Sequence, residues 1–384
     1  MKNSNNDHGK TARARLIAFY LPQYHPIPEN DQWWGKGFTE WTNVAKATPM
    51  FSGHYQPRVP ADLGFYDLRV PEVRMAQAEM ANEYGIEGFC YWHYWFAGKR
   101  LLERPFAEVL KSGEPKFPFC LAWANQTWTG IWHGAPDRIL IKQTYPGIQD
   151  YKTHFYELLD SFNDERYIKI DGKPVFVVYD PKELPEPQVF TDIWRELANK
   201  SGLKDLYFIG NVADLTWVPE ENGFDASVLD SLTIIRRKIG TLYNGYKGYG
   251  KHVLKKILNR SLKRLPLTIF HKPTIYSYQD AIKVLFSRQE TTFEEFPCVI
   301  PNWDNTPRSG NNGLIFHKSS PELFRTHLRE AITRVGHKDY EKRVIFIKSW
   351  NEWAEGNYLE PDLKFGRAYL DVIKNENLIH EISP

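Results

Sequence analysis

Residues 344–356 read Val344-Ile345-Phe346-Ile347-Lys348-Ser349-Trp350-Asn351-Glu352-Trp353-Ala354-Glu355-Gly356. An almost uninterrupted apolar run ends in a cluster of Trp, Asn and Glu side chains. Such a run, without apolar–polar alternation, is typical of a parallel strand that is buried on both faces. The stretch therefore predicts a central strand with polar groups gathered at its carboxyl end.

The same pattern recurs along the chain, and turn residues bound each repeat. We predict eight strands, at Arg15–Tyr20, Ile86–Tyr91, Phe117–Trp123, Pro174–Tyr179, Leu206–Val212, Ala226–Leu229, Phe296–Pro301 and Val344–Ser349.

Segments with helical periodicity lie between these strands. Seven are visible, at Val70–Tyr84, Pro105–Leu110, Tyr151–Phe162, Val189–Lys200, Tyr278–Ser287, Pro321–Val335 and Phe365–Ile373. The missing one is expected as a single turn near Trp217–Asn222. Eight strand–helix repeats favour a closed (β/α)₈ barrel. An open doubly wound sheet is the alternative, although no Gly-rich dinucleotide or phosphate loop follows any strand.

One barrel domain accounts for residues 15–384, after a polar N-terminal tail at 1–14. Residues 232–279 break the pattern because they contain no acidic side chain and many basic ones. Within them, Lys251–Leu265 has apolar residues at helical spacing, which indicates a basic amphipathic insertion after the sixth strand. It either packs on the barrel or contacts an anionic membrane.

Composition and charge exclude several classes of protein. The 384 residues are 42% hydrophobic and 25% charged, with a net charge of +2, so neither disorder nor nucleic-acid binding is indicated. The three cysteines, Cys90, Cys120 and Cys298, lie in apolar runs and are expected to be buried thiols. The start of the chain lacks a signal-peptide pattern, so a cytoplasmic location is expected.

Aromatic side chains are unusually frequent, at 15% of the chain with 13 Trp. Trp rings pack on the faces of sugars, and amides and carboxylates bind sugar hydroxyls. Because the active site of a (β/α)₈ barrel lies at the carboxyl ends of the strands, residues at those ends are the expected glycan-binding set. They are Tyr24, His25, Glu40, Trp41, Trp92, His93, Trp95, Trp123, Asn125, Gln126, Asp180, Trp303, Asp304, Trp350 and Asn351.

Glu352 and Glu355 are the predicted catalytic residues. Cleavage of a glycosidic bond needs one group that protonates the departing oxygen and one that supplies or activates a nucleophile. On a helical turn, a spacing of three residues places both carboxyls on one face. Two solvated acids would show the same spacing, but the position after the last strand, the flanking Trp residues and Gly356 favour a catalytic pair.

Other chemistries have weaker support. His25, His93 and His133 lack the spacing of metal ligands, so neither a metal nor a cofactor is expected. Asp180 and Asp304 are alternative acids that would otherwise bind hydroxyls.

The motifs resemble those of the WbsX family, which is usually described as glycosyltransferases of bacterial surface-polysaccharide gene clusters. The resemblance runs from about Arg15 to Ile373 and rests on the segments Phe19–Asn30, Trp33–Gly35, Gly37–Trp41, Trp123–Gln126, Pro301–Asp304 and Trp350–Gly356.

WbsX proteins also look like distant relatives of the family 99 endo-α-mannosidases, which are retaining (β/α)₈ enzymes with an E-W-x-E pattern. The resemblance implies that Glu352 acts as a base on the sugar 2-hydroxyl and that Glu355 acts as an acid on the departing oxygen. The sugar O2 would then attack C1, as α-mannosides and α-L-rhamnosides permit.

Three hypotheses follow for the function. The first is a retaining enzyme that cleaves or transfers glycosyl units of an oligo- or polysaccharide. The second is a cytoplasmic glycosyltransferase of surface polysaccharide, in peripheral contact with the anionic inner membrane face or a lipid-linked glycan. Against it, no D-x-D motif for a metal–nucleotide site occurs. The third is an inert glycan-binding barrel, which would not need both Glu residues.

Overall fold

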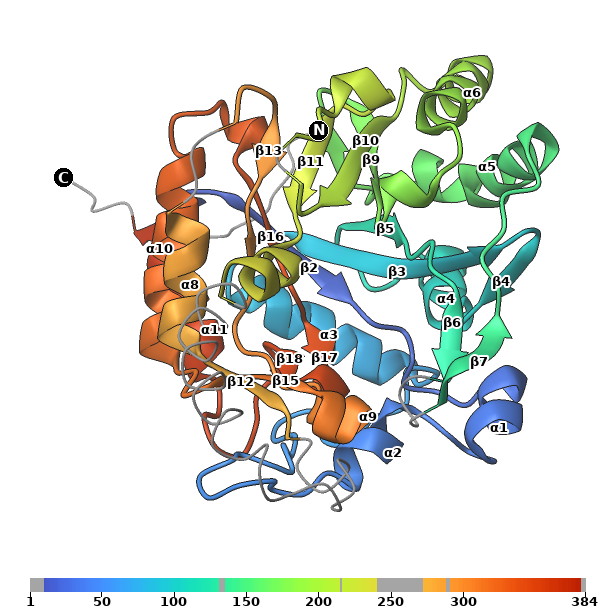
Figure 1. The fold of residues 1–384 in the computed structure, drawn as a ribbon. Coiled ribbons are helices and arrows are strands. Elements are labelled where there is room, and N and C mark those ends of the chain that lie inside the picture. The colour runs from blue at the N-terminus through green and yellow to red at the C-terminus, as the bar shows by residue number, and fades with distance from the viewer. Residues whose placement is uncertain (1–9, 131–134, 215, 240–271, 288–290, 381–384) are drawn as a thin grey trace, which may run out of the picture.

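A computed structural model describes residues 10–130, 135–214, 216–239, 272–287 and 291–380. Its central feature is a parallel sheet in which neighbouring strands follow the order β13-β11-β10-β9-β5-β3-β2-β16-β14. The two ends of this path, β13 (Glu295–Phe296) and β14 (Cys298–Val299), are halves of one strand on either side of Pro297. Because β13 pairs with β11 and β14 pairs with β16, this strand closes the sheet into the predicted barrel (Figure 1).

All eight predicted strands are confirmed, with ends that move by a few residues. The other seven are β2 (Arg15–Tyr20), β3 (Gly88–Phe96), β5 (Phe119–Trp123), β9 (Lys173–Val178), β10 (Tyr207–Val212), β11 (Ala226–Leu229) and β16 (Val344–Ile347).

Helices cover the outside of the barrel, as Figure 1 shows for α5 and α6 on one side and α8, α10 and α11 on the other. The seven predicted helices are confirmed as α3 (Pro71–Glu83), α4 (Arg104–Ser112), α5 (Ile148–Asn163), α6 (Pro187–Lys200), α8 (Tyr278–Phe286), α10 (Pro321–Val335) and α11 (Ala368–Asn377). The expected single turn after the fifth strand is the 3₁₀ turn η3 (Glu220–Asn222).

The barrel strands are buried along almost their whole length. Gly88 begins β3 where the chain passes close to a neighbouring strand, since a Cβ there would lie 2.5 Å from the Pro118 carbonyl oxygen. Cys90 and Cys120 lie opposite each other on the neighbouring strands β3 and β5. Both of them and Cys298 are free, buried thiols, as predicted.

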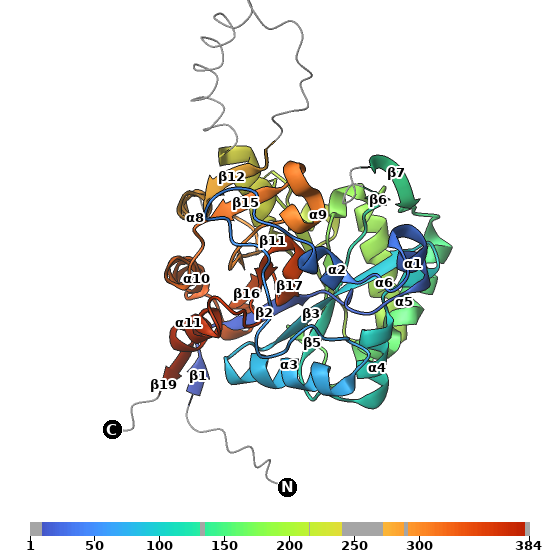
Figure 2. The same ribbon diagram turned by 90° about the horizontal axis from the view of Figure 1, so that it is seen from below.

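Long connections after the strands build the end of the barrel that carries the site, which Figure 2 shows from below. They contain α1 (Pro28–Trp34), α2 (Glu40–Ala45), the hairpin β6 (Trp128–Gly130) with β7 (Ala135–Ile141), the pair β12 (Thr274–Ser277) with β15 (Leu314–His317), and α9 (Thr306–Ser309). After β16 comes the hairpin β17 (Asn351–Glu352) and β18 (Asn357–Tyr358), joined by the 3₁₀ turn η7 (Trp353–Glu355).

The two chain ends meet outside the barrel. Strand β1 (Lys10–Ala12), from the segment predicted as a tail, pairs antiparallel with β19 (Leu378–His380). Of the basic insertion, residues 232–239 belong to a helix that begins at residue 231, while the amphipathic segment Lys251–Leu265 lies outside the described residues. In the part of the chain that the structure describes, no helix is long and apolar enough to cross a membrane.

Candidate active site

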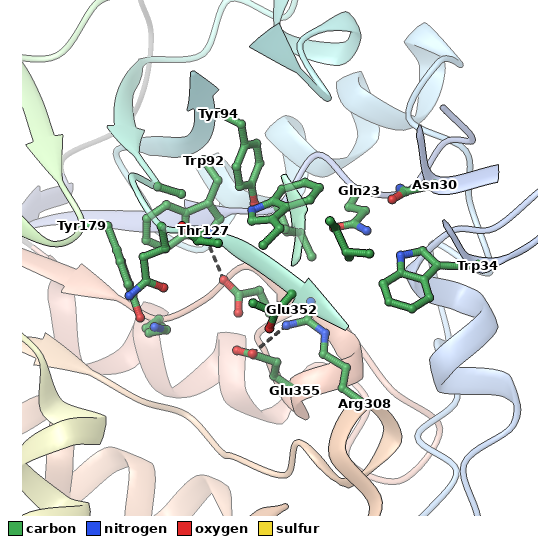
Figure 3. A pocket seen from close by; sticks show the side chains of 17 residues that line it. Gln23, Asn30, Trp34, Trp92, Tyr94, Thr127, Tyr179, Arg308, Glu352 and Glu355 are labelled. Carbon is green, nitrogen blue, oxygen red and sulfur yellow. Dashed lines mark hydrogen bonds and ion pairs between the residues drawn. The ribbon is translucent and has the colours of Figure 1, made fainter. Parts of the chain in front are cut away.

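A cavity of about 240 Å³ opens at the carboxyl ends of the barrel strands. Figure 3 shows aromatic, amide and charged side chains around it. It is lined by Leu21, Gln23, Asn30, Trp34, Trp92, Tyr94, Ala124, Gln126, Thr127, Trp128, Thr129, Leu140, Tyr179, Arg308, Lys348, Glu352 and Glu355.

Glu352 and Glu355 point into this cavity from the last strand connection (Figure 3). Glu352 ends β17 and Glu355 ends η7, so the predicted turn brings both carboxyls to one side. The two side chains share a hydrogen bond. Glu352 is only 4% exposed, and its Oε1 accepts a hydrogen bond of 2.7 Å from Trp92 Nε1.

Gly356 makes this tight turn feasible. Its φ of +54° lies in the left-handed region, where side chains with a Cβ are strained. A Cβ at this position would lie 2.9 Å from Asp304 Cβ and 3.0 Å from the Arg58 guanidinium. The backbone after Glu355 therefore needs glycine for two independent reasons.

Arg308 of α9 links the catalytic pair to a buried carboxyl behind it. Its Nη1 lies 2.6 Å from Glu355 Oε1, and its Nε lies 3.0 Å from Oε2 of Glu40 at the start of α2. Both Arg308 and Glu40 are buried. Burial raises the pKa of Glu40, and the Arg308 charge opposes that shift.

The electrostatic surroundings of Glu352 and Glu355 differ, because only Glu355 forms an ion pair with Arg308. Burial, reinforced by the neighbouring Glu355 charge, raises the pKa of Glu352 to about 8. Burial acts in the same direction on Glu355 and is the largest single effect there. The Arg308 charge, the hydrogen bond with Glu352 and the charges of Lys348 and Arg236 together outweigh it, so the pKa of Glu355 lies below its ordinary value. These opposite shifts favour the protonated form of Glu352 and the charged form of Glu355.

A second cavity, of about 550 Å³, adjoins the first and shares Gln126, Tyr179, Lys348 and Glu355 with it. Its remaining lining consists of Asp230, Leu232, Thr233, Arg236, Thr274, Tyr276, Trp303, Asn305, Ser309, Asn312, Gly313 and Leu314. The Glu355 carboxyl therefore faces a cleft with space on both sides.

Only some of the predicted glycan-binding residues line these cavities. Trp92 and Gln126 lie in the first cavity, and Gln126 and Trp303 lie in the second. The other predicted residues line neither cavity.

Four of those others support the loop that carries the pair. The Tyr24 hydroxyl donates to the Asn351 carbonyl oxygen and accepts from the Trp353 N–H. Asn351 Oδ1 accepts from the Leu21 N–H at 2.7 Å. Trp41 donates to the Tyr66 carbonyl oxygen and packs beside Trp353.

Trp350 is the fourth, and it packs in the barrel core against Phe89. These four residues position the catalytic turn from behind.

The predicted histidines and their aromatic neighbours are also structural. His25 Nδ1 lies 2.9 Å from the Pro22 carbonyl oxygen, and His93 forms a buried hydrogen bond with His154. Trp95 stacks on that same His154 ring, and Trp123 lies edge-on to it. Burial lowers the pKa of both members of the His93–His154 pair, which keeps them neutral.

The Asn125 and Asp304 side chains form hydrogen bonds that fix neighbouring loops. Asn125 donates to the Asp180 carbonyl oxygen and accepts from the Asp180 N–H. Asp304 is fully buried and accepts hydrogen bonds from His54, Gln56 and Thr306. Neither aspartate, each an alternative acid in the sequence, lines either of the two cavities.

Sequence reasoning missed Arg308 and Lys348. Arg308 follows no strand directly, so no strand-end pattern could have identified it. Lys348 interrupts the last apolar run, and a charged residue near the end of a buried strand was the available signal. Gln23 and Asn30 also line the first cavity, with buried amide atoms that have no hydrogen-bond partner among the described residues.

Solved structures with the same fold include a protein described as "Glycoside hydrolase-like protein", with a TM-score of 0.59 and 16% identity over 97% of this chain and 95% of that chain. The GH99 endo-alpha-mannosidase from Bacteroides thetaiotaomicron gives a TM-score of 0.53 and 14% identity, over 94% of this chain and 96% of that chain.

Two sequence relatives are the proteins "Uncharacterized protein WxcX" from two strains of Xanthomonas campestris pv. campestris, 36% and 38% identical over 95% of this chain. The chain spans about half the length of these relatives, since the matches cover 50% of each. The family model described as "Glycosyltransferase WbsX" matches residues 16–373. The chain therefore belongs to the WbsX family of carbohydrate-active enzymes.

Proposed function

We propose that this chain cleaves or transfers glycosyl units of an α-mannoside- or α-rhamnoside-type glycan, with retention of configuration, using Glu352 and Glu355. The observation that carries the proposal is a pair of neighbouring carboxyls, Glu352 buried and Glu355 partly buried against Arg308, that face a cavity with aromatic walls. One acid kept neutral beside one carboxylate kept charged is the arrangement that glycosidic bond cleavage requires.

We assign the proton donor to Glu352 and the anionic partner to Glu355. This order is opposite to the one that the family 99 resemblance implies. The reason is Arg308, which contacts Glu355 at 2.6 Å and stabilises its charged form. Glu352 lies against the Trp92 indole and keeps its proton at neutral pH.

In this scheme Glu352 protonates the departing oxygen while Glu355 assists attack on C1 by the sugar O2. The hydrogen bond between the two carboxyls supports this scheme over inversion, because inversion needs about 6.5–9.5 Å between the carboxyls to admit a water. The unpartnered amides of Gln23 and Asn30 are available to sugar hydroxyls.

Transfer to an acceptor glycan is the second candidate, as a glycosyltransferase of surface polysaccharide. The second cavity favours it, because a cleft that continues past Glu355 has space for an acceptor as well as a donor. Hydrolysis and transfer differ only in which hydroxyl reacts with the activated sugar.

The test is incubation of the purified chain with a panel of α-mannosyl and α-rhamnosyl oligosaccharides, and separately with sugar nucleotides plus those oligosaccharides. Products are identified by mass spectrometry. Shortened or rearranged oligosaccharides, absent with Glu352→Gln and Glu355→Gln, support the proposal. Products that persist in both variants would refute it.

A further inference from the structure

Lys348 is a partly buried cation that the proposed chemistry does not use. It follows β16 directly and lines both cavities at the place where they meet. Its Nζ lies 5.9 Å from the ring centroids of Trp92 and Trp303, and 5.5 Å from that of Tyr179. Within the described residues this ammonium forms no ion pair and no hydrogen bond.

The ammonium stays charged in this position. Burial lowers its pKa, but Tyr179 and the nearby carboxyls Glu352, Glu355 and Asp230 outweigh burial and raise that pKa above the ordinary lysine value. The ammonium has three hydrogen-bond donors, and because it lines both cavities they are available to a bound ligand.

The carboxyls around Lys348 are already engaged elsewhere. Glu355 pairs with Arg308, and the protonated form of Glu352 is favoured. Asp230 accepts from the Thr233 N–H at the start of the helix at 231–239. None of these groups is within the 4.0 Å of an ion pair with Lys348.

The wall of the second cavity adds positive charge. It is formed in part by residues 232–236 and 274–276, which are the two described ends of the acid-free segment 232–279. Arg236 lies on this wall, is exposed, and makes no ion pair among the described residues. Lys348 and Arg236 thus both line this cavity without forming an ion pair among the described residues.

We propose that Lys348 is an anion-recognition residue and that the glycan bound in this cleft carries a carboxylate, as a uronic acid does. The inference rests on the proposed function, since it names the class of glycan taken by the same site. A diphosphate is the competing anion for the same two cations, and the experiment below separates the two. The ring-lined space around Nζ suits a small planar anion, which accepts charge-assisted hydrogen bonds from the ammonium.

The experiment compares two ligands that differ only at C6, methyl α-D-mannopyranosiduronate and methyl α-D-mannopyranoside, with UDP as a third probe. Binding is measured by saturation-transfer NMR at low salt on the full chain. We expect the uronate to bind about tenfold more tightly than the neutral glycoside, a difference of about 1.4 kcal/mol, because hydrogen bonds between two charged groups are stronger than those to a neutral hydroxyl.

Lys348→Met should abolish this preference while leaving the neutral glycoside bound, and Lys348→Arg should retain most of it. Lys364→Met is the matched control, because Lys364 also lies over aromatic rings but lines neither cavity. Thermal melts of each variant establish that it is folded.

Equal binding of uronate and neutral glycoside would overturn the inference and leave the proposed function standing. A uronate preference that survives in folded Lys348→Met, or tighter binding of UDP than of the uronate, would also overturn it. If neither glycoside binds, both proposals fail.

Discussion

Replacing Arg308 with Met tests whether this side chain stabilises the two carboxylates that it contacts, Glu40 and Glu355. The Arg308 side chain is 5% exposed and serves two carboxylates, at 3.0 Å and 2.6 Å. Removing one partner of a buried ion pair typically costs about 3–5 kcal/mol, because the remaining charge is left buried without compensation. Glu40, which is fully buried, would then have to stay charged alone or take up a proton.

We therefore expect Arg308→Met to lower the free energy of unfolding by about 3–5 kcal/mol at pH 7. Urea titration followed by tryptophan fluorescence measures this change. The double variant Arg308→Met/Glu40→Gln should lose less than Arg308→Met alone, because it has no uncompensated charge at position 40.

Arg195 provides the matched control. It also bridges two carboxylates, Asp205 at 2.8 Å and Asp225 at 2.6 Å, but its side chain is 23% exposed. Arg195→Met should cost about 1 kcal/mol, as solvent screens that network. Equal losses for Arg308→Met and Arg195→Met, or a double variant less stable than Arg308→Met alone, would refute the reasoning.

Three further predictions follow from the same geometry. Since Glu352 must keep its proton, kcat/KM should fall as pH rises through about 8. On the acid side, kcat/KM should fall only below the ordinary Glu range, where Glu355 takes up a proton. The fall near pH 8 should be absent in Glu352→Gln, and its persistence would contradict the assignment. Because folding raises the pKa of Glu352 above its ordinary value of 4.5, the protonated side chain stabilises the folded state at low pH, and this stabilisation is lost as pH rises from 4.5 towards 8. Urea titrations across that range should therefore show a shallower decline in the free energy of unfolding for Glu352→Gln than for wild type. Gly356→Ala should abolish activity and lower the free energy of unfolding more than the control Gly366→Ala, for which we expect a loss of about 1–2 kcal/mol. Both glycines have a left-handed φ, but an added Cβ would collide with neighbouring atoms only at Gly356. Equal melting temperatures for the two variants would contradict this prediction.

The sequence was sufficient to predict the barrel because each of its strands is a buried apolar run. Such runs carry a strong local signal, and the largest error in the strand bounds was β3, which continues to Phe96 beyond the predicted Tyr91. The closure at Pro297 was not predictable, because it depends on which strands become neighbours. The strand-end rule also identified Glu352 and Glu355, since position along a strand fixes the end of the barrel at which a residue lies.

The rule overestimated how many aromatic side chains face the cavity. Side chains at strand ends point alternately in different directions, so Trp350 and Trp123 pack inward while Trp92 lines the cleft. Arg308 escaped prediction because its role depends on contacts with residues 47 and 268 positions away. Such contacts exist only after the chain has folded.

The measurement that tests the central claim most directly is the anomeric configuration of the first product. A glycan from the α-mannosyl and α-rhamnosyl panel that the chain turns over is followed by ¹H NMR in the first minutes of reaction. The account predicts that the α-anomer of the product appears first, because Glu352 and Glu355 support a two-step displacement through O2. Initial appearance of the β-anomer would show single-step inversion and contradict the account.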